Sequence, residues 1–226
     1  MKKAIAIIKE IVKLPRVSIK LSTNHEEGKR IFESFTKRHP RMPIFANKAI
    51  GVALIDISKF TAKAEYIASV NGKNSAAYFS RKAEKSGYSV ESIDPNQHQK
   101  EILEIHFSNP DRQGKSLPDN YKTEIQYPLN DYNRYYAAKV DGKIVGYIWT
   151  IQSGELVVLN RIMGHQEFMK DGLMYLLATE VIGSIIHQKS LVKYVMYDTF
   201  FGASDGLKMY KKRLGFNPYK VNWTKQ

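Results

Sequence analysis

Three side chains that could accept a proton lie at or next to the ends of predicted strands. Glu155 begins a strand predicted over residues 155–163, His165 follows that strand in a loop, and Asp198 ends a β-rich run that begins at Val192. Histidine titrates nearest neutral pH, which suits proton transfer. A lone loop histidine is often only a solvated side chain, so His165 and Asp198 are hypotheses for a general base.

Several other kinds of chemistry are excluded by composition and spacing. The chain has 226 residues and no cysteine, which excludes disulfides, thiolate zinc sites and cysteine nucleophiles. Its six histidines show no HExxH or similar ligand spacing, and the carboxylates do not cluster, so no metal site is predicted. The sequence also contains no P-loop, no dinucleotide glycine fingerprint and no serine nucleophile elbow.

The most informative stretch of the sequence for secondary structure contains Asp198 and covers residues 192–219, VKYVMYDTFFGASDGLKMYKKRLGFNPY. A strand-like run is followed by Ser204 and Asp205, either of which can cap the start of a helix that runs to Arg213. Gly215 is expected to end the helix, because glycine adopts the left-handed conformation without steric cost.

The predicted helix is amphipathic. Leu207, Tyr210 and Leu214 fall on one side. The basic residues that favour the other side are Lys208, Lys211, Lys212 and Arg213. Tyr210 can therefore be read as a helix tyrosine that buries its ring and leaves its hydroxyl outside.

A second interpretation of Tyr210 comes from a family resemblance. A strand, a helix with LKMYKKRLGF and a final strand resemble the C-terminal end of the GNAT acyltransferase superfamily. The resemblance implies that Tyr210 protonates the departing thiolate when an acyl group is transferred. It also implies acyl transfer to an amine as the activity.

The middle of the chain extends this resemblance. Strands predicted at 134–140 and 143–151 are joined by Asp141-Gly142, a strong hairpin signal. The sequence YYAAKVDGKIVGYIWTIQSG resembles the second and third strands of a GNAT core.

A strand at 155–163 and a long helix at 168–187 continue the same order of elements. The expected fold class is therefore α/β (mixed α+β), with a GNAT-like acyltransferase core at 93–226. The basic α/β segment at 1–92 is interpreted as a reduced GNAT-like half.

One basic helix favours a particular branch of the superfamily. The sequence SRKAEKSGY lies in a helix predicted to begin near Asn74 and to stop at Gly87, with a strand at 88–93 after it. This arrangement resembles the Fem-type and CelD-like branch, in which aminoacyl-tRNA is often the acyl donor. The resemblance therefore adds tRNA as an expected partner.

The loop after the fourth strand is expected to hold the donor. In most of the superfamily it carries an Arg/Gln-x-x-Gly-x-Gly/Ala signature, whose backbone N–H groups and helix N-terminus bind the pyrophosphate of coenzyme A. The loop here reads GHQEFMKDGLMYLL, and the resemblance implies cofactor contacts from Met163, His165, Lys170 and Gly172. Only Gly172 matches a signature glycine. This departure is compatible with an aminoacyl-tRNA donor or with no acyl-CoA binding at all.

The long loop at 108–121 flanks the acceptor site in the GNAT resemblance. Arg112, Gln113 and Lys115 would then bind an anionic or hydroxyl-rich acceptor. The alternative is a solvated surface loop.

The positive charge is concentrated near the start of the sequence. The net charge is +13, and residues 1–50 carry 12 lysines and arginines against 4 acidic residues. Such a patch attracts RNA, acidic lipid headgroups or a phosphorylated substrate, although a basic protein without such a partner is an equal interpretation. Ile5, Ile8 and Val12 share a helical face that either packs on the domain or makes peripheral membrane contact.

We expect a cytoplasmic protein, because Lys9 and Glu10 interrupt the first apolar run and no run approaches the roughly 18 apolar residues of a membrane span. The resemblance implies an N-acyltransferase that uses acetyl-CoA or another acyl-CoA and acts on an amino sugar or a cell-envelope precursor. An aminoacyl-tRNA-dependent transferase and a non-catalytic GNAT-fold binding protein are the alternatives.

Overall fold

The protein is mixed α/β, as predicted, and it forms two compact units. The computed structural model describes residues 11–40, 42–109, 111–112, 115–188 and 191–226. The first unit contains residues 1–59, 152–158 and 191–226, and the second contains 60–151 and 159–190. This is a spatial division, so the linear division of the sequence at 92/93 stays a prediction. The predicted helix around Ile5 and Ile8 lies outside the described residues.

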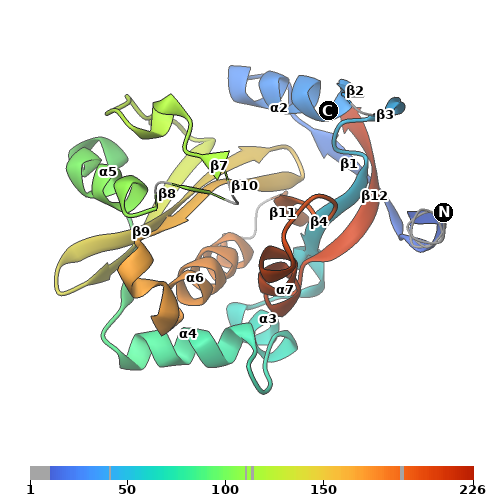
Figure 1. Cartoon of the computed structure of the whole chain (residues 1–226). Helices are drawn as coiled ribbons and strands as arrows, with labels where there is room; N and C mark the ends of the chain where they lie inside the picture. Colours follow the sequence, from blue (N-terminus) through green and yellow to red (C-terminus); the bar gives the residue numbers. More distant parts are fainter. Residues whose placement is uncertain (1–10, 41, 110, 113–114, 189–190) are drawn as a thin grey trace. The chain divides into compact units, whose positions relative to one another are not determined.

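The first unit is built on a mixed sheet (Figure 1). Its elements are β1 (Arg16–Leu21), α2 (Glu26–Thr36), β2 (Arg38–His39), β3 (Met42–Ala46), β4 (Ile50–Asp56), the 3-10 turn η1 (Ile57–Lys59), β11 (Tyr194–Thr199), α7 (Asp205–Arg213), β12 (Asn217–Lys225) and the first residues of β10 (Leu156–Gly164). The strand order is β1-β12-β4-β11-β10. β1 runs parallel to β12 and β11 parallel to β10, whereas β4 is antiparallel to both of its neighbours.

The structure confirms α7 and its ends. Ser204 caps the helix by accepting a hydrogen bond from the N–H of Leu207, and Gly215 follows it with φ of 86°. One detail of the predicted faces is wrong, because Lys211 is 1% exposed. The spacing of Leu207, Lys211 and Leu214 fits one face of a helix as well as the predicted spacing does, and the long apolar stem of lysine can be buried.

The second unit also has a sheet with helices on both faces (Figure 1). Its elements are α3 (Lys63–Ser69), α4 (Ala76–Lys85), β5 (Ser89–Ser92), η2 (Pro95–Gln97), α5 (Gln99–Phe107), β6 (Asp111–Arg112), β7 (Lys115–Ser116), η3 (Asp119–Tyr121), β8 (Asn133–Val140), β9 (Lys143–Ser153), η4 (Gln166–Asp171), α6 (Leu173–His187) and the rest of β10. The strand order is β5-β8-β9-β10. The predicted hairpin is confirmed, since Asp141 and Gly142 have φ of 50° and 77°.

Alternate residues along these strands face opposite sides of the sheet. Tyr135, Tyr147 and Met163 pack with Ile102 and Ile105 of α5 on one face. The other face carries α6, with α4 packed against it. Ser80 of α4 and Thr179 of α6 join these two helices by a buried hydrogen bond of 3.0 Å.

The long helix begins later than predicted. Residues 166–171 form the 3-10 helix η4, and α6 starts only at Leu173. Gly172 separates the two because its φ of 86° lies in the left-handed region. The predicted helical start at Phe168 is therefore wrong.

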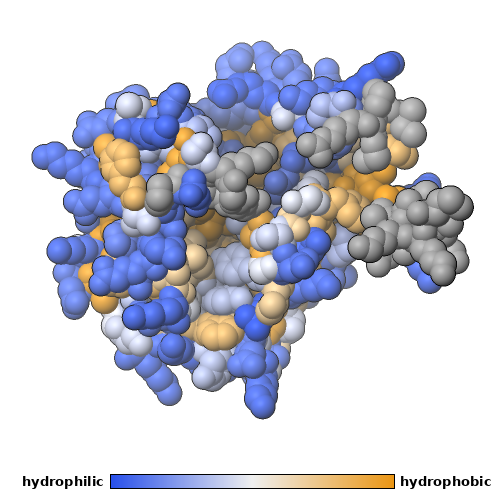
Figure 2. All heavy atoms as spheres, viewed as in Figure 1, coloured by the Kyte–Doolittle hydropathy of each residue, from blue (hydrophilic) through white to orange (hydrophobic). Residues whose placement is uncertain are grey.

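Hydrophilic residues cover most of the face seen in Figure 2, as expected for a protein with 25% charged residues. Among the described residues, no helix combines the length and apolar character that crossing a bilayer requires.

Candidate active site

In the first unit, the predicted catalytic residues lie on β11 and α7. Tyr210 is half-buried on α7, and its ring packs edge-on against Tyr197 with 6.3 Å between centroids. Asp198 has φ of 53°, at an irregularity in the pairing of β11 with β4, and its carboxylate is ion-paired with Lys48. The proposed roles of Tyr210 and Asp198 stay predictions.

Lys211 is a buried cation beside these residues. Its Nζ donates a hydrogen bond to the carbonyl of Thr199 at 2.7 Å and lies 4.7 Å from the ring centroid of Tyr197. Burial lowers the pKa of Lys211 to about 8; Asp198 opposes this shift and Lys48 adds to it. Lys211 therefore loses its proton close to physiological pH.

Glu155 is held by ion pairing and does not act as a free base. Its carboxylate accepts hydrogen bonds from Lys193 Nζ at 2.6 Å and from the N–H of Lys20 at 2.9 Å. Burial raises its pKa, but the hydrogen bonds from Lys193 and Lys20 outweigh burial, so the pKa lies below its ordinary value. Glu155 stays ionised and links β1 to Lys193, the residue that precedes β11.

In the second unit, several polar groups of the loop predicted to bind the donor form hydrogen bonds within the protein. His165 caps η4, with Nδ1 accepting from the N–H of Glu167 at 3.4 Å. The N–H of Gln166 donates to Ser108 Oγ at 3.0 Å, and the carbonyl of Lys170 accepts from Lys82 at 3.4 Å. The N–H groups of Gln166 and Glu167 are thus paired inside the protein, whereas the GNAT signature leaves such N–H groups open to pyrophosphate.

Gly172 has a structural reason to be glycine. A Cβ atom at this position would lie 2.5 Å from the carbonyl oxygen of Phe79, on α4. The close approach of α4 therefore requires the glycine, independently of any phosphate.

The loop also carries opposing charge. Asp171 accepts a hydrogen bond from the hydroxyl of Tyr88 at 2.9 Å. Burial, then Asp171 and Glu167, raise the pKa of Tyr88 to about 12. The carboxylates of Glu167 and Asp171 balance the ammonium groups of Lys170 and Lys82 at this loop, so the loop offers a pyrophosphate no excess positive charge and does not fit the usual coenzyme A site.

The structure describes only some of the other side chains predicted to contact the cofactor or the acceptor. The side chain of Met163 is buried in the α5-facing cluster, so only its backbone could contact a cofactor. Arg112 and Lys115 lie on β6 and β7, but their side chains are outside the described part of the chain, and Gln113 is outside it altogether. Their roles stay predictions.

A cluster that sequence reasoning missed surrounds Arg161, on β10. Arg161 is 6% exposed, and its guanidinium carbon lies 4.0 Å from the ring centroid of Tyr121 and 5.7 Å from that of Trp149. Burial lowers the pKa of Arg161, but the oxygens of Tyr147, Tyr121 and Tyr127 raise it above its ordinary value. The group is therefore a buried, permanent cation.

His106 fixes the hydrogen-bond direction in this cluster. Its Nδ1 is 2.7 Å from the carbonyl oxygen of Tyr121, which can only accept, so Nδ1 carries the proton. Its Nε2 is 2.7 Å from the hydroxyl of Tyr147. In the neutral tautomer with the proton on Nδ1, Nε2 accepts from the hydroxyl of Tyr147, whose oxygen lone pairs then face other partners.

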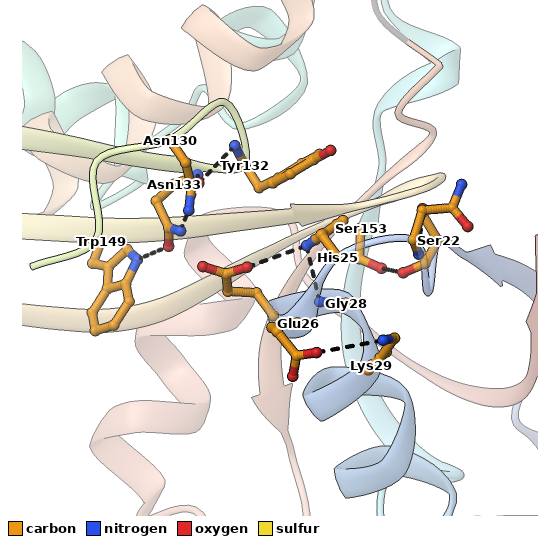
Figure 3. A network of polar contacts seen from close by, with 12 residues as sticks. Ser22, His25, Glu26, Gly28, Lys29, Asn130, Tyr132, Asn133, Trp149 and Ser153 are labelled. Atoms are coloured by element: carbon orange, nitrogen blue, oxygen red, sulfur yellow. Dashed lines mark hydrogen bonds and ion pairs between the residues drawn. The ribbon is translucent and has the colours of Figure 1, made fainter.

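Trp149 is held in place by an asparagine pair (Figure 3). Its indole N–H donates to Asn133 Oδ1 at 2.6 Å, and Asn133 Nδ2 donates to Asn130 Oδ1 at 2.9 Å. In the first unit, the same figure shows Ser153 donating to the carbonyl of Ser22 at 2.9 Å.

The Arg161 cluster left one signal in the sequence. Val157, Leu159, Arg161 and Met163 share the period of two of a strand, and all four are buried. An arginine at an inward position of an apolar strand indicates a special site, because unpaired charges are rarely buried. Its aromatic neighbours come from separate segments, so no local pattern reveals them.

Comparison with known proteins supports the fold. Neither a protein-family model nor a curated protein matches this sequence. The solved structure of FemX matches with a TM-score of 0.59 at 10% identity, over 75% of this chain and 59% of that one. The fold is therefore GNAT-like and similar to that of FemX. The chain spans about three-fifths of the length of FemX.

Two other solved structures are less similar to this chain than FemX is. L-PGS from Bacillus licheniformis has a TM-score of 0.48 at 14% identity, over 76% of this chain and 61% of that chain. The ribosomal-protein-S18-alanine N-acetyltransferase from Escherichia coli has 0.44 at 13% identity, over 57% and 77%. Among the described residues, no three His, Asp or Glu side chains are grouped to bind a metal ion.

Proposed function

We propose that the protein is an acyltransferase that transfers an acyl group to an amine acceptor. The supporting observation is the GNAT-like fold that it shares with FemX over 75% of its length. In this reaction the amine nitrogen forms a bond to the acyl carbonyl carbon, the bond to the leaving group breaks, and the amine proton passes to a base. An amino sugar or an envelope precursor stays a prediction for the acceptor.

Tyr210 is assigned to protonate the leaving group. Tyr210→Phe is expected to lower turnover by about 100-fold, because general acid catalysis contributes at least that much, while folding is retained. Initial rates and circular dichroism check this. Tyr219→Phe, at another half-buried tyrosine of the first unit, is the matched control. Unchanged turnover in Tyr210→Phe would remove the assignment.

We further propose aminoacyl-tRNA as the donor in preference to acyl-CoA. The supporting observation is the loop from His165 to Gly172, where the N–H groups of Gln166 and Glu167 have partners inside the protein and the carboxylates of Glu167 and Asp171 offset the charge of the lysines. The Fem-type resemblance implies the same donor. Acyl-CoA remains the second candidate, because GNAT resemblance implies it.

A basic surface on α4 supports a polyanionic donor. Tyr78, Arg81, Lys82, Lys85 and Ser86 line a surface depression of about 310 Å³. The three basic side chains are exposed, so they can contact phosphates without displacing a partner from the core.

Calorimetric titration with acetyl-CoA, coenzyme A and charged tRNA tests the donor. We expect tRNA binding that weakens steeply with salt, and a shallower salt slope when Arg81, Lys82 and Lys85 are replaced by serine. The control variant replaces the exposed Lys100, Lys122 and Lys143 instead. Saturable acetyl-CoA binding without tRNA binding would reverse the donor assignment. Binding of none of the three would favour the non-catalytic alternative.

A further inference from the structure

The guanidinium group of Arg161 is a buried positive charge without a negative partner. Among the residues that the structure describes, every ion pair involves other side chains, and Nη1 of Arg161 has no hydrogen-bond partner. Burial of an unpaired charge is strongly unfavourable, so folding alone does not explain this arrangement.

The polar neighbours of Arg161 provide dipoles but no counter-charge. Burial raises the pKa of Tyr147 well above its ordinary value and also raises the pKa of Tyr127, so both hydroxyls are neutral. The imidazole of His106, 2.7 Å from the hydroxyl of Tyr147, carries no negative charge either. Within the described part of the chain, no carboxylate forms an ion pair with the guanidinium.

The geometry suits a planar anion. The guanidinium carbon lies 4.0 Å from the ring centroid of Tyr121, and Arg161 forms hydrogen bonds with Tyr147 and Tyr127, so Nη1 is the part of its edge left for a further hydrogen bond. A guanidinium edge matches the two oxygens of a carboxylate. We propose that Arg161, framed by Tyr121, Tyr147 and Trp149, binds the carboxylate group of a small-molecule ligand.

A carboxylate fits this site better than a phosphate. One guanidinium balances one negative charge, whereas a phosphate monoester carries about 1.5–2 at neutral pH and would stay partly unbalanced. The surroundings are otherwise apolar, with Leu117, Ile102 and Ile105 buried in the same cluster.

Entry of the ligand requires movement of the segment above Arg161. Tyr121 and Tyr127 belong to the stretch between β7 and β8, whose regular structure is limited to η3. Such a stretch opens at lower cost than a strand or a long helix does. The acyl acceptor is the ligand that this site suits, an assignment that rests on the proposed function; carboxylate binding itself does not.

The two tryptophans of the chain allow a direct test. Trp149 lies beside Arg161, whereas Trp223 packs on Phe35 and donates its indole N–H to the carbonyl of Lys48. We expect propionate to shift the indole N–H resonance of Trp149 saturably and to leave that of Trp223 in place. Propionamide, which has the same shape without the charge, is expected to shift neither. Trp149→Phe assigns the two resonances.

Variants separate a ligand site from a structural arginine. Arg161→Met should weaken propionate binding by about tenfold or more and raise the midpoint of thermal unfolding, because it removes an unbalanced buried charge. Lys100→Met, at an exposed basic residue of the same unit, should change neither. A merely structural Arg161 would instead give a lower midpoint.

Several outcomes would overturn the proposal. These are equal shifts from both probes, undiminished binding in Arg161→Met, or no saturable shift up to about 100 mM propionate, a limit suited to so small a ligand. The comparison of probes uses the unmodified protein, so it decides the question even if Arg161→Met does not fold. The propionate titration contains no acyl donor and therefore tests carboxylate binding alone. Failure of acyl transfer to a carboxylate-bearing amine, in a separate assay, would count against the proposed function alone.

Discussion

Gly172→Ala is expected to lower the free energy of unfolding by about 2–4 kcal/mol. Two effects add at this position. The φ of 86° is unfavourable for any residue with a Cβ atom, and that atom would lie 2.5 Å from the backbone oxygen of Phe79. Backbone cannot move aside as a flexible side chain can, so α4 or η4 must shift. Urea unfolding monitored by circular dichroism measures the loss.

Gly87 provides the matched control. It belongs to the same unit and has φ of 85°, but a Cβ atom there would meet nothing within 4 Å. Gly87→Ala should therefore lower the free energy of unfolding only by the strain of the positive φ, about 1 kcal/mol. Equal losses in the two variants would show that the contact with Phe79 has no energetic weight. A larger loss at Gly172 would mean that the signature glycine is retained for helix packing.

Lys211→Met is expected to raise the free energy of unfolding near pH 7 by about 1–3 kcal/mol. The folded pKa of about 8 lies below the unfolded value of about 10.5. Between these values the unfolded chain binds a proton that the folded protein lacks, so stability rises with pH. Below pH 8 both states are protonated, and the folded state bears the full cost of the buried charge.

The variant should lose this rise between about pH 8 and pH 10.5. Thr199, whose carbonyl loses a donor, is half-buried, so water can replace the lysine. Lys212→Met, at the exposed next residue, should keep the wild-type profile. A variant less stable than wild type at pH 7, or an unchanged pH profile, would show that Lys211 is protonated and stabilising in the fold.

The fold was largely predictable because its signals are local. Asp141-Gly142 determines a hairpin, and Ser204 and Gly215 delimit α7 by capping chemistry that acts within a few residues. The buried face of α7 was harder to predict, because Tyr210 and Lys211 are neighbours and either one lies on the same helical face as Leu207 and Leu214. The tertiary packing, which buries Lys211 more fully, decides between them.

The candidate site was predictable to a smaller extent. The loop containing His165 was located correctly, but the 3-10 geometry of η4 and the contact of Gly172 with Phe79 depend on α4, about 90 residues earlier in the sequence. The Arg161 cluster combines β9, β10, α5 and the stretch before β8. Because these contacts join distant segments, the only sequence feature that indicates the cluster is an arginine at an inward position of β10.

The parallel pairing of β1 with β12 sets the order in which the protein can fold during synthesis. Arg16 pairs with Lys220, so the first strand of that sheet waits for almost the whole chain to be translated. The second unit is complete once Ser190 has been made. Domains fold as they leave the ribosome, so the second unit should form first. Until β12 has been made, β1 lacks this partner strand, and its apolar Ile19 and Leu21 are available to a chaperone.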